Sequence, residues 1–390
     1  MNRSDRLNSL LENFVETGPT GCALSVIQNR EQLYEGYLGV ADLETKKPIG
    51  PDTIYRIYSM TKVVTCVAAL ILYERGKFLL TDPLEEYLPE FKDPKIFESI
   101  HNGEIKVVPS PRSIQIKDLF TMTSGLTYGG QGTEVERQVS KVMAELTKRE
   151  KVGKQQGTAV RTLSRALARI PLEFEPGTHW KYGLSHDVLG ALIEVISGKT
   201  FGEFLNEEIF APLGMYDTFF RVPEHKSDRV CSLYDRADDG TMTKNTFLDN
   251  HSEPTPIFES GGAGLWSTLY DYSRFAQMLA SGGTLDGAKI LGSKTIELMA
   301  SNHINAEMLP ELGWNYENGY GYGLGVRVMM NREIGGSNST LGEFGWSGLA
   351  GTYVFIDPKE KLSAVYMQQM LPNFEQYHQP RIRNVIYGTL

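Results

Sequence analysis

The feature that most constrains the fold is the presence of strand-like segments at the two far ends of the chain. Residues 22–28 (CALSVIQ) and 33–40 (LYEGYLGV) flank a turn, and so do residues 349–356 and 362–367. Such runs, bounded by turn-forming residues, are typical of β-hairpins. The segments between them have mostly helical periodicity, at 60–76, 133–150, 158–169, 188–197 and 268–281. This order predicts one antiparallel sheet to which both chain ends contribute.

We therefore predict an α/β (α+β) fold in which an antiparallel sheet is flanked by helices. The sheet domain is expected to combine residues 1–85 with 250–390, and residues 86–249 are expected to form an inserted, mostly helical lobe. The boundary between two such lobes is a natural cleft, so the active site is expected there.

Composition narrows the class of partner. The 390 residues are 41% hydrophobic and 22% charged, as in ordinary globular proteins, and the net charge of -9 disfavours nucleic acid and anionic membranes. The longest apolar run, residues 63–73, has about half the length that a membrane span needs. Three widely separated cysteines, without metal-type spacing or a visible export signal, lead us to expect a cytoplasmic protein.

The most informative segment opens the apolar helix predicted at 60–76. Ser59 and Lys62 lie on one stripe with Val63, Cys66 and Leu70, so Lys62 is expected to point toward the buried face. A cation in the first turn also opposes the helix dipole. Ser59 as a plain N-cap is the simpler interpretation, but a capping box would have Glu or Gln where Lys62 stands.

An S-x-x-K pair has a chemical use, because positions i and i+3 are neighbours on a helix. Burial lowers the pKa of a lysine and would leave a neutral amine able to take the proton of Ser59. The backbone N–H groups at the helix start would face a developing oxyanion. The pair therefore suggests nucleophilic acyl transfer.

Two later segments add candidates. Tyr182 lies in an aromatic-rich loop that precedes a helix expected to be N-capped by Ser185, and a phenol at such a place is most often core filler. The run from Gly342 to Tyr353 is punctuated by glycines, which allow close approach of another backbone or a ligand.

Together the three segments resemble the serine β-lactamase and penicillin-binding-protein superfamily, specifically its class C-like esterase branch, the family VIII carboxylesterases. Stretches at 54–57, 119–126, 187–190 and 261–268 look like that family as well. The resemblance implies a β-lactamase-like fold and a serine hydrolase that cleaves short-chain carboxylic esters through an acyl-enzyme, without a cofactor or a metal. The implied partner is a small-molecule ester.

The resemblance also implies roles for residues. Ser59 would be the nucleophile, Lys62 its general base or base partner, and Tyr182 the tyrosine of the family's Y-x-N motif. The backbone N–H groups of Ser59 and Leu349 would form the oxyanion hole, with Leu349 uncertain by one residue. The substrate-lining strand would carry three further residues, which are Trp346, Ser347 and Gly348.

This chain departs from the lactamase pattern in two places. Trp346-Ser347-Gly348 stands where lactamases carry K-T-G, and Leu184 replaces the Asn of the tyrosine motif. Both changes remove polar contacts to a lactam and favour neutral esters. The alternatives are a β-lactamase or D-Ala-D-Ala carboxypeptidase, an acyltransferase on the same fold, and a non-catalytic binding protein.

Other catalytic sites are less well supported by the sequence. The glycines at 261–264 lack the ending of a phosphate-binding loop and are expected to form a tight, crowded turn. The histidines show no zinc-type spacing. A Ser-His-Asp triad through His186 or His251 stays open, because triads are defined in space.

Overall fold

In the computed structural model, residues 2–101, 104–151, 159–248 and 258–390 are described. Both the predicted domain boundary at 249/250 and His251 lie outside these residues. The α-helices are α1 (Arg3–Thr17), α2 (Thr61–Glu74), α3 (Ile116–Phe120), α4 (Glu134–Lys151), α5 (Ala159–Leu167), α6 (Ser185–Ser197), α7 (Phe201–Leu205), α8 (Ala211–Leu213), α9 (Leu269–Ala280), α10 (Ser293–Met299), α11 (Arg332–Gly335) and α12 (Glu375–Tyr387). No helix in this part of the chain is both long and apolar enough to cross a membrane.

The strands are β1 (Gly21–Gln28), β2 (Glu31–Gly39), β3 (Ile54–Arg56), β4 (Lys95–His101), β5 (Glu104–Pro109), β6 (Tyr234–Arg236), β7 (Met242–Lys244), β8 (Trp266–Thr268), β9 (Thr284–Leu285), β10 (Ala288–Lys289), β11 (Tyr320–Tyr322), β12 (Arg327–Met329), β13 (Phe344–Ser347), β14 (Tyr353–Asp357), β15 (Leu362–Gln368) and β16 (Met370–Leu371). Among the described residues, the main sheet is seven-stranded, in the order β11-β12-β13-β14-β15-β1-β2. All its neighbouring strands are antiparallel. The predicted sheet built from both chain ends is confirmed.

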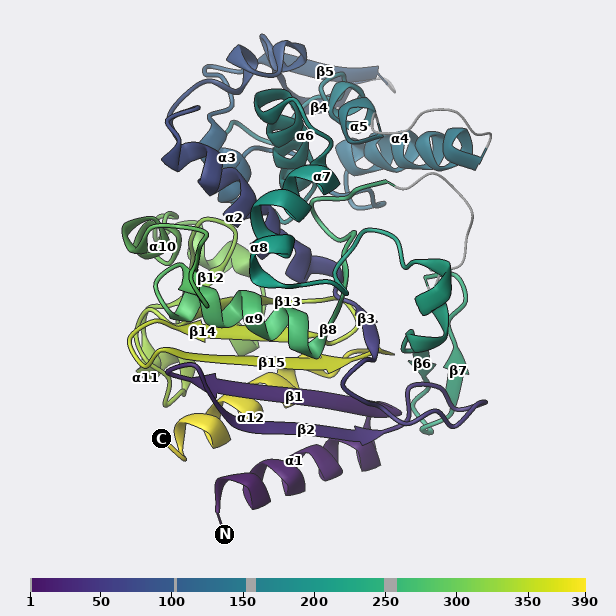
Figure 1. The fold of residues 1–390 in the computed structure, drawn as a ribbon. Coiled ribbons are helices and arrows are strands. Elements are labelled where there is room, and N and C mark those ends of the chain that lie inside the picture. The colour runs from purple at the N-terminus through teal and green to yellow at the C-terminus, as the bar shows by residue number, and fades with distance from the viewer. Residues whose placement is uncertain (1, 102–103, 152–158, 249–257) are drawn as a thin grey trace.

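The two faces of this sheet are covered by different helices. Along β14, Tyr353 and Phe355 belong to a core shared with α1 and α12, whereas Val354 and Ile356 belong to the large core on the other face. This alternation is the two-residue period of a strand buried on both faces. Helix α9 packs on that other face, opposite α1 and α12 (Figure 1).

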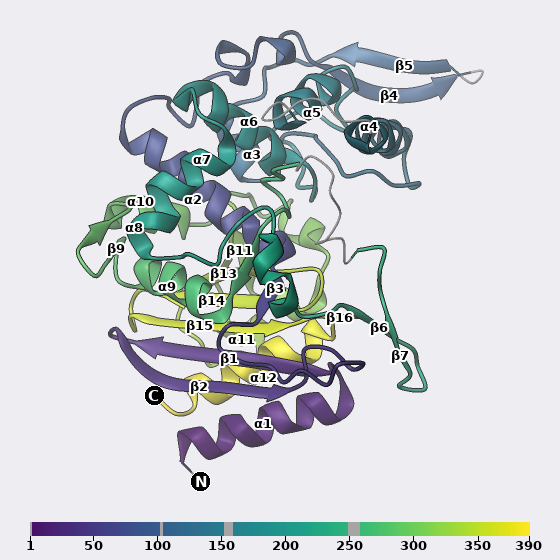
Figure 2. The same ribbon diagram turned by 45° about the vertical axis from the view of Figure 1, so that its right-hand side comes forward.

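A second layer, which is mostly helical, lies beyond α9. Helix α2 packs against α6, and α3 and α5 also pack on α6, while the β4-β5 hairpin projects at the outer edge of the molecule (Figure 2). Every residue of α2 from Thr61 to Leu72 is buried. Helix α2, which begins next to Ser59 and contains Lys62, therefore lies between the helical layer and the layer of α9 and the main sheet.

One sequence boundary was wrong. The strand predicted at 349–356 begins only at Tyr353, because the chain first turns between Gly348 and Gly351, whose φ is +95°. The glycine-punctuated segment before this turn is itself a strand, β13, which pairs with β12 and β14. The turn thus leaves the sheet at the end of β13.

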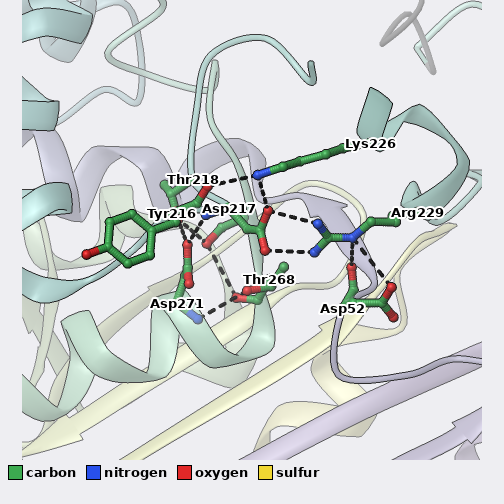
Figure 3. A network of polar contacts seen from close by, with 9 residues as sticks. Asp52, Tyr216, Asp217, Thr218, Lys226, Arg229, Thr268 and Asp271 are labelled. Carbon is green, nitrogen blue, oxygen red and sulfur yellow. Dashed lines mark hydrogen bonds and ion pairs between the residues drawn. The ribbon is translucent and has the colours of Figure 1, made fainter. Parts of the chain in front are cut away.

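A polar network holds the amino-terminal end of α9 in place (Figure 3). Asp271, in the first turn of α9, accepts hydrogen bonds from the Asp217 backbone N–H at 2.7 Å and from Thr218 Oγ1 at 2.9 Å. The Asp217 carboxylate pairs with Lys226 and with Arg229, each at 2.7 Å. These contacts hold residues 217–229 against the start of α9, the helix that packs on the main sheet.

Candidate active site

Ser59 lies in a short 3₁₀ turn, Tyr58–Met60, that leads directly into α2. The α-helix begins at Thr61, and its N-cap residue, Met60, makes no side-chain capping bond. Ser59 is therefore not the N-cap that the simpler interpretation made it. Tyr58 has a φ of +43°, a strained value for a residue with a side chain. Such strain persists where the surroundings impose it, often at functional sites.

The turn is held from the sheet side and from α9. The Ile57 N–H donates to the Leu265 carbonyl at 3.1 Å, and the Leu265 N–H donates to Thr61 Oγ1 at 3.1 Å. The hydroxyl of Tyr272, on α9, donates to the Met60 carbonyl at 2.8 Å. Ser59 is thus fixed by bonds on both sides of the turn.

Lys62 is fully buried, as its helical stripe predicted. Its Nζ lies 3.2 Å from Ser59 Oγ, 2.9 Å from the hydroxyl of Tyr128 and 2.7 Å from the carbonyl oxygen of Gly262. An ammonium has three donors, and three oxygens surround this one. The predicted contact between Lys62 and Ser59 is therefore present.

Tyr128 was missed by the sequence analysis. It follows the stretch at 119–126 that carried the family resemblance, and it lies just beyond the end of that stretch. Its ring meets the ring of Tyr182 edge-on, with centroids 5.6 Å apart. Neither periodicity nor spacing singles out this phenol, because a loop from a distant part of the chain brings it to Lys62.

The electrostatics of Lys62 differ from the expectation. Burial lowers its pKa, but the phenols of Tyr128 and Tyr182 outweigh burial, and the pKa of Lys62 is raised above its ordinary value. Burial also raises the pKa of Tyr128, against the opposing effect of Lys62. The neutral amine expected from burial alone is therefore not the resting form, since nearby oxygens stabilise the ammonium.

Tyr182 joins Lys62 to β13. Lys62 Nζ lies 4.5 Å from the centre of the Tyr182 ring, within the range of a cation–π contact. The hydroxyl of Tyr182 accepts a hydrogen bond from Trp346 Nε1 at 3.0 Å. Trp314 packs edge-on against the rings of both Tyr182 and Trp346. The structure thus brings Ser59, Lys62, Tyr182 and Trp346 together.

The residues that follow Trp346 approach the Ser59 turn through their backbone. A Cβ added to Gly348 would lie 2.4 Å from the carbonyl oxygen of Ile57, so only glycine fits here. Thr352 Oγ1 donates to that same carbonyl at 3.2 Å. The close backbone approach expected from the glycines is therefore present, two residues before Ser59.

Trp346, Ser347 and Leu349 each have partners of their own. Trp346 is only 3% exposed, and its indole N–H already binds Tyr182. Ser347 donates from Oγ to Glu375 Oε2, at the start of α12, at 3.1 Å. The Leu349 side chain is 49% exposed, while its carbonyl accepts from Asn373 Nδ2 at 3.0 Å. An oxyanion role would fall to the backbone N–H of Leu349.

His186 is placed behind the lysine. It is fully buried, and its Nε2 lies 3.2 Å from the Phe120 carbonyl and 3.5 Å from Cys66 Sγ. Burial, helped by the charge of Lys62, lowers the pKa of His186 to about 3, so the ring is neutral at ordinary pH. These contacts do not build a triad with Ser59.

Two further expectations are decided by local packing. Helix α6 begins at Ser185, and its N-cap is Leu184, so the predicted Ser185 cap is wrong. The Ser185 hydroxyl instead lies 2.9 Å from that of Ser124 in a fully buried pair.

The glycines at 261–264 form the crowded turn that was predicted, because a Cβ on Gly261 would lie 2.3 Å from the His186 carbonyl.

Comparison with known proteins places this arrangement in a family. The profile of the family described as Beta-lactamase matches residues 7–386. The Mycobacterium tuberculosis protein Rv1367c is 32% identical over 365 residues, which cover 92% of this chain and 88% of that protein. Esterase EstB of Burkholderia gladioli is 28% identical over 377 residues, with coverages of 89% and 85%.

Solved structures agree in fold. A structure described as EstCE1, a hydrolase with promiscuous acyltransferase activity, superimposes with a TM-score of 0.81 at 23% identity and covers 98% of each chain. Simvastatin Synthase (LovD) from Aspergillus terreus gives a TM-score of 0.83 at 21% identity, over 100% of this chain and 98% of its own. The predicted β-lactamase-like fold is confirmed, and the chain belongs to the Beta-lactamase family.

Proposed function

We propose that this protein is a carboxylesterase-type serine hydrolase that cleaves small-molecule, short-chain esters through an acyl-enzyme on Ser59. The observation that carries the proposal is the buried contact of Lys62 Nζ with both Ser59 Oγ and the Tyr128 hydroxyl, at 3.2 and 2.9 Å. A fully buried lysine, held against a serine hydroxyl in a strained turn, is an arrangement suited to nucleophilic catalysis. The esterases among its relatives support the same chemistry.

In the proposed reaction, Ser59 Oγ attacks the ester carbonyl carbon, and its proton passes to the coupled group of Lys62 and Tyr182. The ester C–O bond then breaks, and that group returns the proton to the departing alkoxide. In the second half of the reaction, water gives a proton to the same group and attacks the acyl carbon. The bond between that carbon and Ser59 Oγ breaks, and the proton returns to Oγ, which releases the acid and restores Ser59. Such acid–base help contributes about 10²- to 10⁴-fold.

The raised pKa of Lys62 bears on which form reacts. The coupled group must first lose one proton before it can accept that of Ser59, and the pKa of this step belongs to the group as a whole. The reacting form therefore becomes more abundant as pH rises. We expect activity to increase toward alkaline pH.

Stabilisation of the tetrahedral oxyanion is assigned to the backbone N–H groups of Ser59 and Leu349. The contact between Gly348 and the Ile57 carbonyl supports this assignment, because it brings the turn at 348–351 against the turn of the nucleophile. Each such donor contributes about 10²- to 10³-fold to the rate.

Neutral esters fit the site better than β-lactams do. Where lactamases carry a cation, this chain has Trp346, whose indole is buried and bonded to Tyr182. The next residue, Ser347, is bonded to the carboxylate of Glu375. A negative charge beside the strand opposes an anionic substrate. These contacts support an esterase over a β-lactamase or carboxypeptidase.

Acyl transfer to a second substrate is the other activity to test. Relatives include Monacolin J acid methylbutanoyltransferase of Aspergillus terreus, 28% identical over 258 residues. The same acyl-enzyme serves both reactions, and only the acceptor differs.

The proposal also includes two features of the whole protein. The first is the division into two lobes, one formed by residues 1–85 with 250–390 and the other by residues 86–249. The second is a cytoplasmic location, which the three buried free cysteines support.

Two measurements test the proposal. A fluorophosphonate should label Ser59 alone, located by mass spectrometry of the digest, with Ser59→Ala as the control. Ser124 and Ser185, which are fully buried, provide internal negatives. Short-chain p-nitrophenyl esters should have a higher kcat/KM than nitrocefin. Absence of label would favour the binding-protein alternative, and a preference for nitrocefin would favour the lactamase.

A further inference from the structure

A buried carboxylate lies behind the catalytic lysine without an ion-pair partner among the described residues. Asp187, in the first turn of α6, is 2% exposed. Its Oδ1 accepts hydrogen bonds from Ser260 Oγ at 2.6 Å and from the Gly262 N–H at 3.3 Å, while Oδ2 has no hydrogen-bond partner within the described part of the chain. A buried charge with so few partners is costly, so its retention needs a reason.

A chain of hydrogen bonds connects this carboxylate to Lys62. Lys62 Nζ donates to the Gly262 carbonyl at 2.7 Å. The N–H of Ala263, on the other end of the same peptide group, donates to Ser260 Oγ at 3.1 Å, and Ser260 donates in turn to Asp187. Every donor in the chain points from the ammonium toward the carboxylate, the arrangement in which hydrogen bonds strengthen one another.

The loop that carries this peptide lies directly against the start of α6. A Cβ added to Gly262 would lie 2.6 Å from Asp187 Oδ2, and one added to Gly261 would lie 2.3 Å from the His186 carbonyl. The loop backbone therefore rests directly on the start of α6. This close approach, which the two glycines allow, places the Gly262 carbonyl against Lys62.

Among the described residues that the electrostatics of Lys62 involve, the other groups do not supply a negative charge at neutral pH. Tyr128 and Tyr182 are phenols, Cys66 is a buried thiol whose pKa is raised by burial, and His186 is neutral. Burial raises the pKa of the Asp187 carboxyl above its usual range, whereas the hydrogen bond from Ser260 and the charge of Lys62 act in the opposite direction and favour the carboxylate. Its place in the first turn of α6 also favours a negative charge.

We propose that Asp187 is a positioning residue that, through Ser260 and the Gly262–Ala263 peptide, orients the Lys62 ammonium toward Ser59 and supplies its counter-charge. This inference rests on the proposed function, since it assigns how the base of that same site is held. It predicts two separable effects of Asp187: on the maximal rate, through orientation, and on the pH at which the lysine group titrates, through charge.

The decisive variant is Asp187→Asn, whose amide oxygen can still accept from Ser260 and Gly262. We expect the pH-independent kcat for a p-nitrophenyl ester to fall about 5- to 10-fold, because the chain of hydrogen bonds then ends on a neutral acceptor instead of a charged one, with KM little changed. Loss of the negative charge destabilises the ammonium, so the midpoint of the kcat/KM profile should move to lower pH by about one unit.

The matched control is Asp271→Asn, which removes another buried carboxylate from the first turn of a helix. It should lower stability and leave the pH midpoint in place. If Asp187→Asn also left the midpoint unchanged, Asp187 would be a structural residue only and the inference would be wrong.

Ser260 provides a second route if Asp187→Asn does not fold. Ser260→Ala interrupts the chain and keeps the carboxylate, so kcat should fall, whereas Ser260→Thr keeps the hydroxyl and should restore it. An unchanged kcat in Ser260→Ala would overturn the inference. Fluorophosphonate labelling of Ser59 in the parent is measured first: no label means that the proposed function fails, whereas label with unaltered variants means that only this inference fails.

Discussion

The indole N–H of Trp346 donates a hydrogen bond to the hydroxyl oxygen of Tyr182 across a distance of 3.0 Å. The two rings also contact each other, with centroids 5.6 Å apart. Trp346 thereby fixes the phenol that packs on Lys62, the proposed base. Its main action on the reaction is expected to pass through Tyr182.

Trp346→Phe tests this relationship, because it keeps an aromatic ring and removes the donor. Loss of a neutral hydrogen bond worth about 1 kcal/mol predicts a fall in kcat of about fivefold for short-chain esters. Because the acyl-binding surface keeps its ring, KM should change less than kcat does. A change confined to KM would instead make Trp346 a substrate-binding residue, as first predicted.

Lys62→Arg should be nearly as damaging as Lys62→Met. A guanidinium keeps the charge, but it is not deprotonated in proteins and is too large for a fully buried site. We expect a loss in kcat of at least 100-fold, measured with a p-nitrophenyl ester. Lys181→Arg is the matched control, since Lys181 adjoins Tyr182 but pairs with Glu136 at 2.9 Å.

Tyr128→Phe removes one of the three oxygens around the ammonium. The remaining acceptors hold Lys62 less well, so kcat should fall by about 10-fold or more. Phenol oxygens raise the pKa of Lys62, so the alkaline rise of activity should also begin at lower pH. Tyr216→Phe, at a side chain that is 76% exposed, should alter neither quantity. If Tyr128→Phe had the kcat and the pH dependence of the parent enzyme, Tyr128 would have no part in the reaction.

Gly348→Ala should damage both activity and stability. The added methyl would lie 2.1 Å from Thr352 Oγ1 and 2.4 Å from the Ile57 carbonyl, and the second contact involves rigid backbone. Forcing the two turns apart costs about 1–3 kcal/mol and displaces the proposed oxyanion donors. Thermal unfolding and esterase assays measure the two effects. Gly50→Ala, whose nearest neighbour would be 3.5 Å away, should behave like the parent.

Stability should fall as the pH rises from about 4.5 to about 7, in part because of Glu194. Burial raises the pKa of its carboxyl to about 7 from the ordinary 4.5. The folded state then binds more protons than the unfolded state between these values, so stability is lost as pH rises through this window. Glu194→Gln should reduce the difference in Tm between pH 5 and pH 8 by a few degrees. The exposed Glu44→Gln should leave that difference unchanged.

The sequence carried enough information for the sheet and for the core of the site. Alternation at both chain ends predicted the hairpins, because strands buried on one or both faces need apolar side chains at a regular period. Ser59 and Lys62 were found because an unusual cation lies on an otherwise apolar helix stripe. Tyr182 needed the family resemblance, since a loop phenol has no local signal of its own.

What the sequence did not reveal depends on contacts between distant segments. Tyr128 and the Gly262 carbonyl contact Lys62 although they are 66 and 200 positions away in the sequence. The phenols of Tyr128 and Tyr182 reverse the expected direction of its pKa shift. The Ser185 cap failed for a similar reason, because Ser124 takes up its hydroxyl. Local patterns predict which side chains are buried, but not which partners they meet inside.

The order of strands in the main sheet has a consequence for biosynthesis. Strand β1 pairs with β15, so the chain from Gln28 to Leu362 must be translated before the two strands can meet. At about 5–20 residues per second, the amino-terminal hairpin waits some tens of seconds for its neighbour. During that time one edge of β1 remains unpaired and available to other extended chains. We therefore expect this protein to need chaperones during synthesis to a greater extent than the stability of its folded state would suggest.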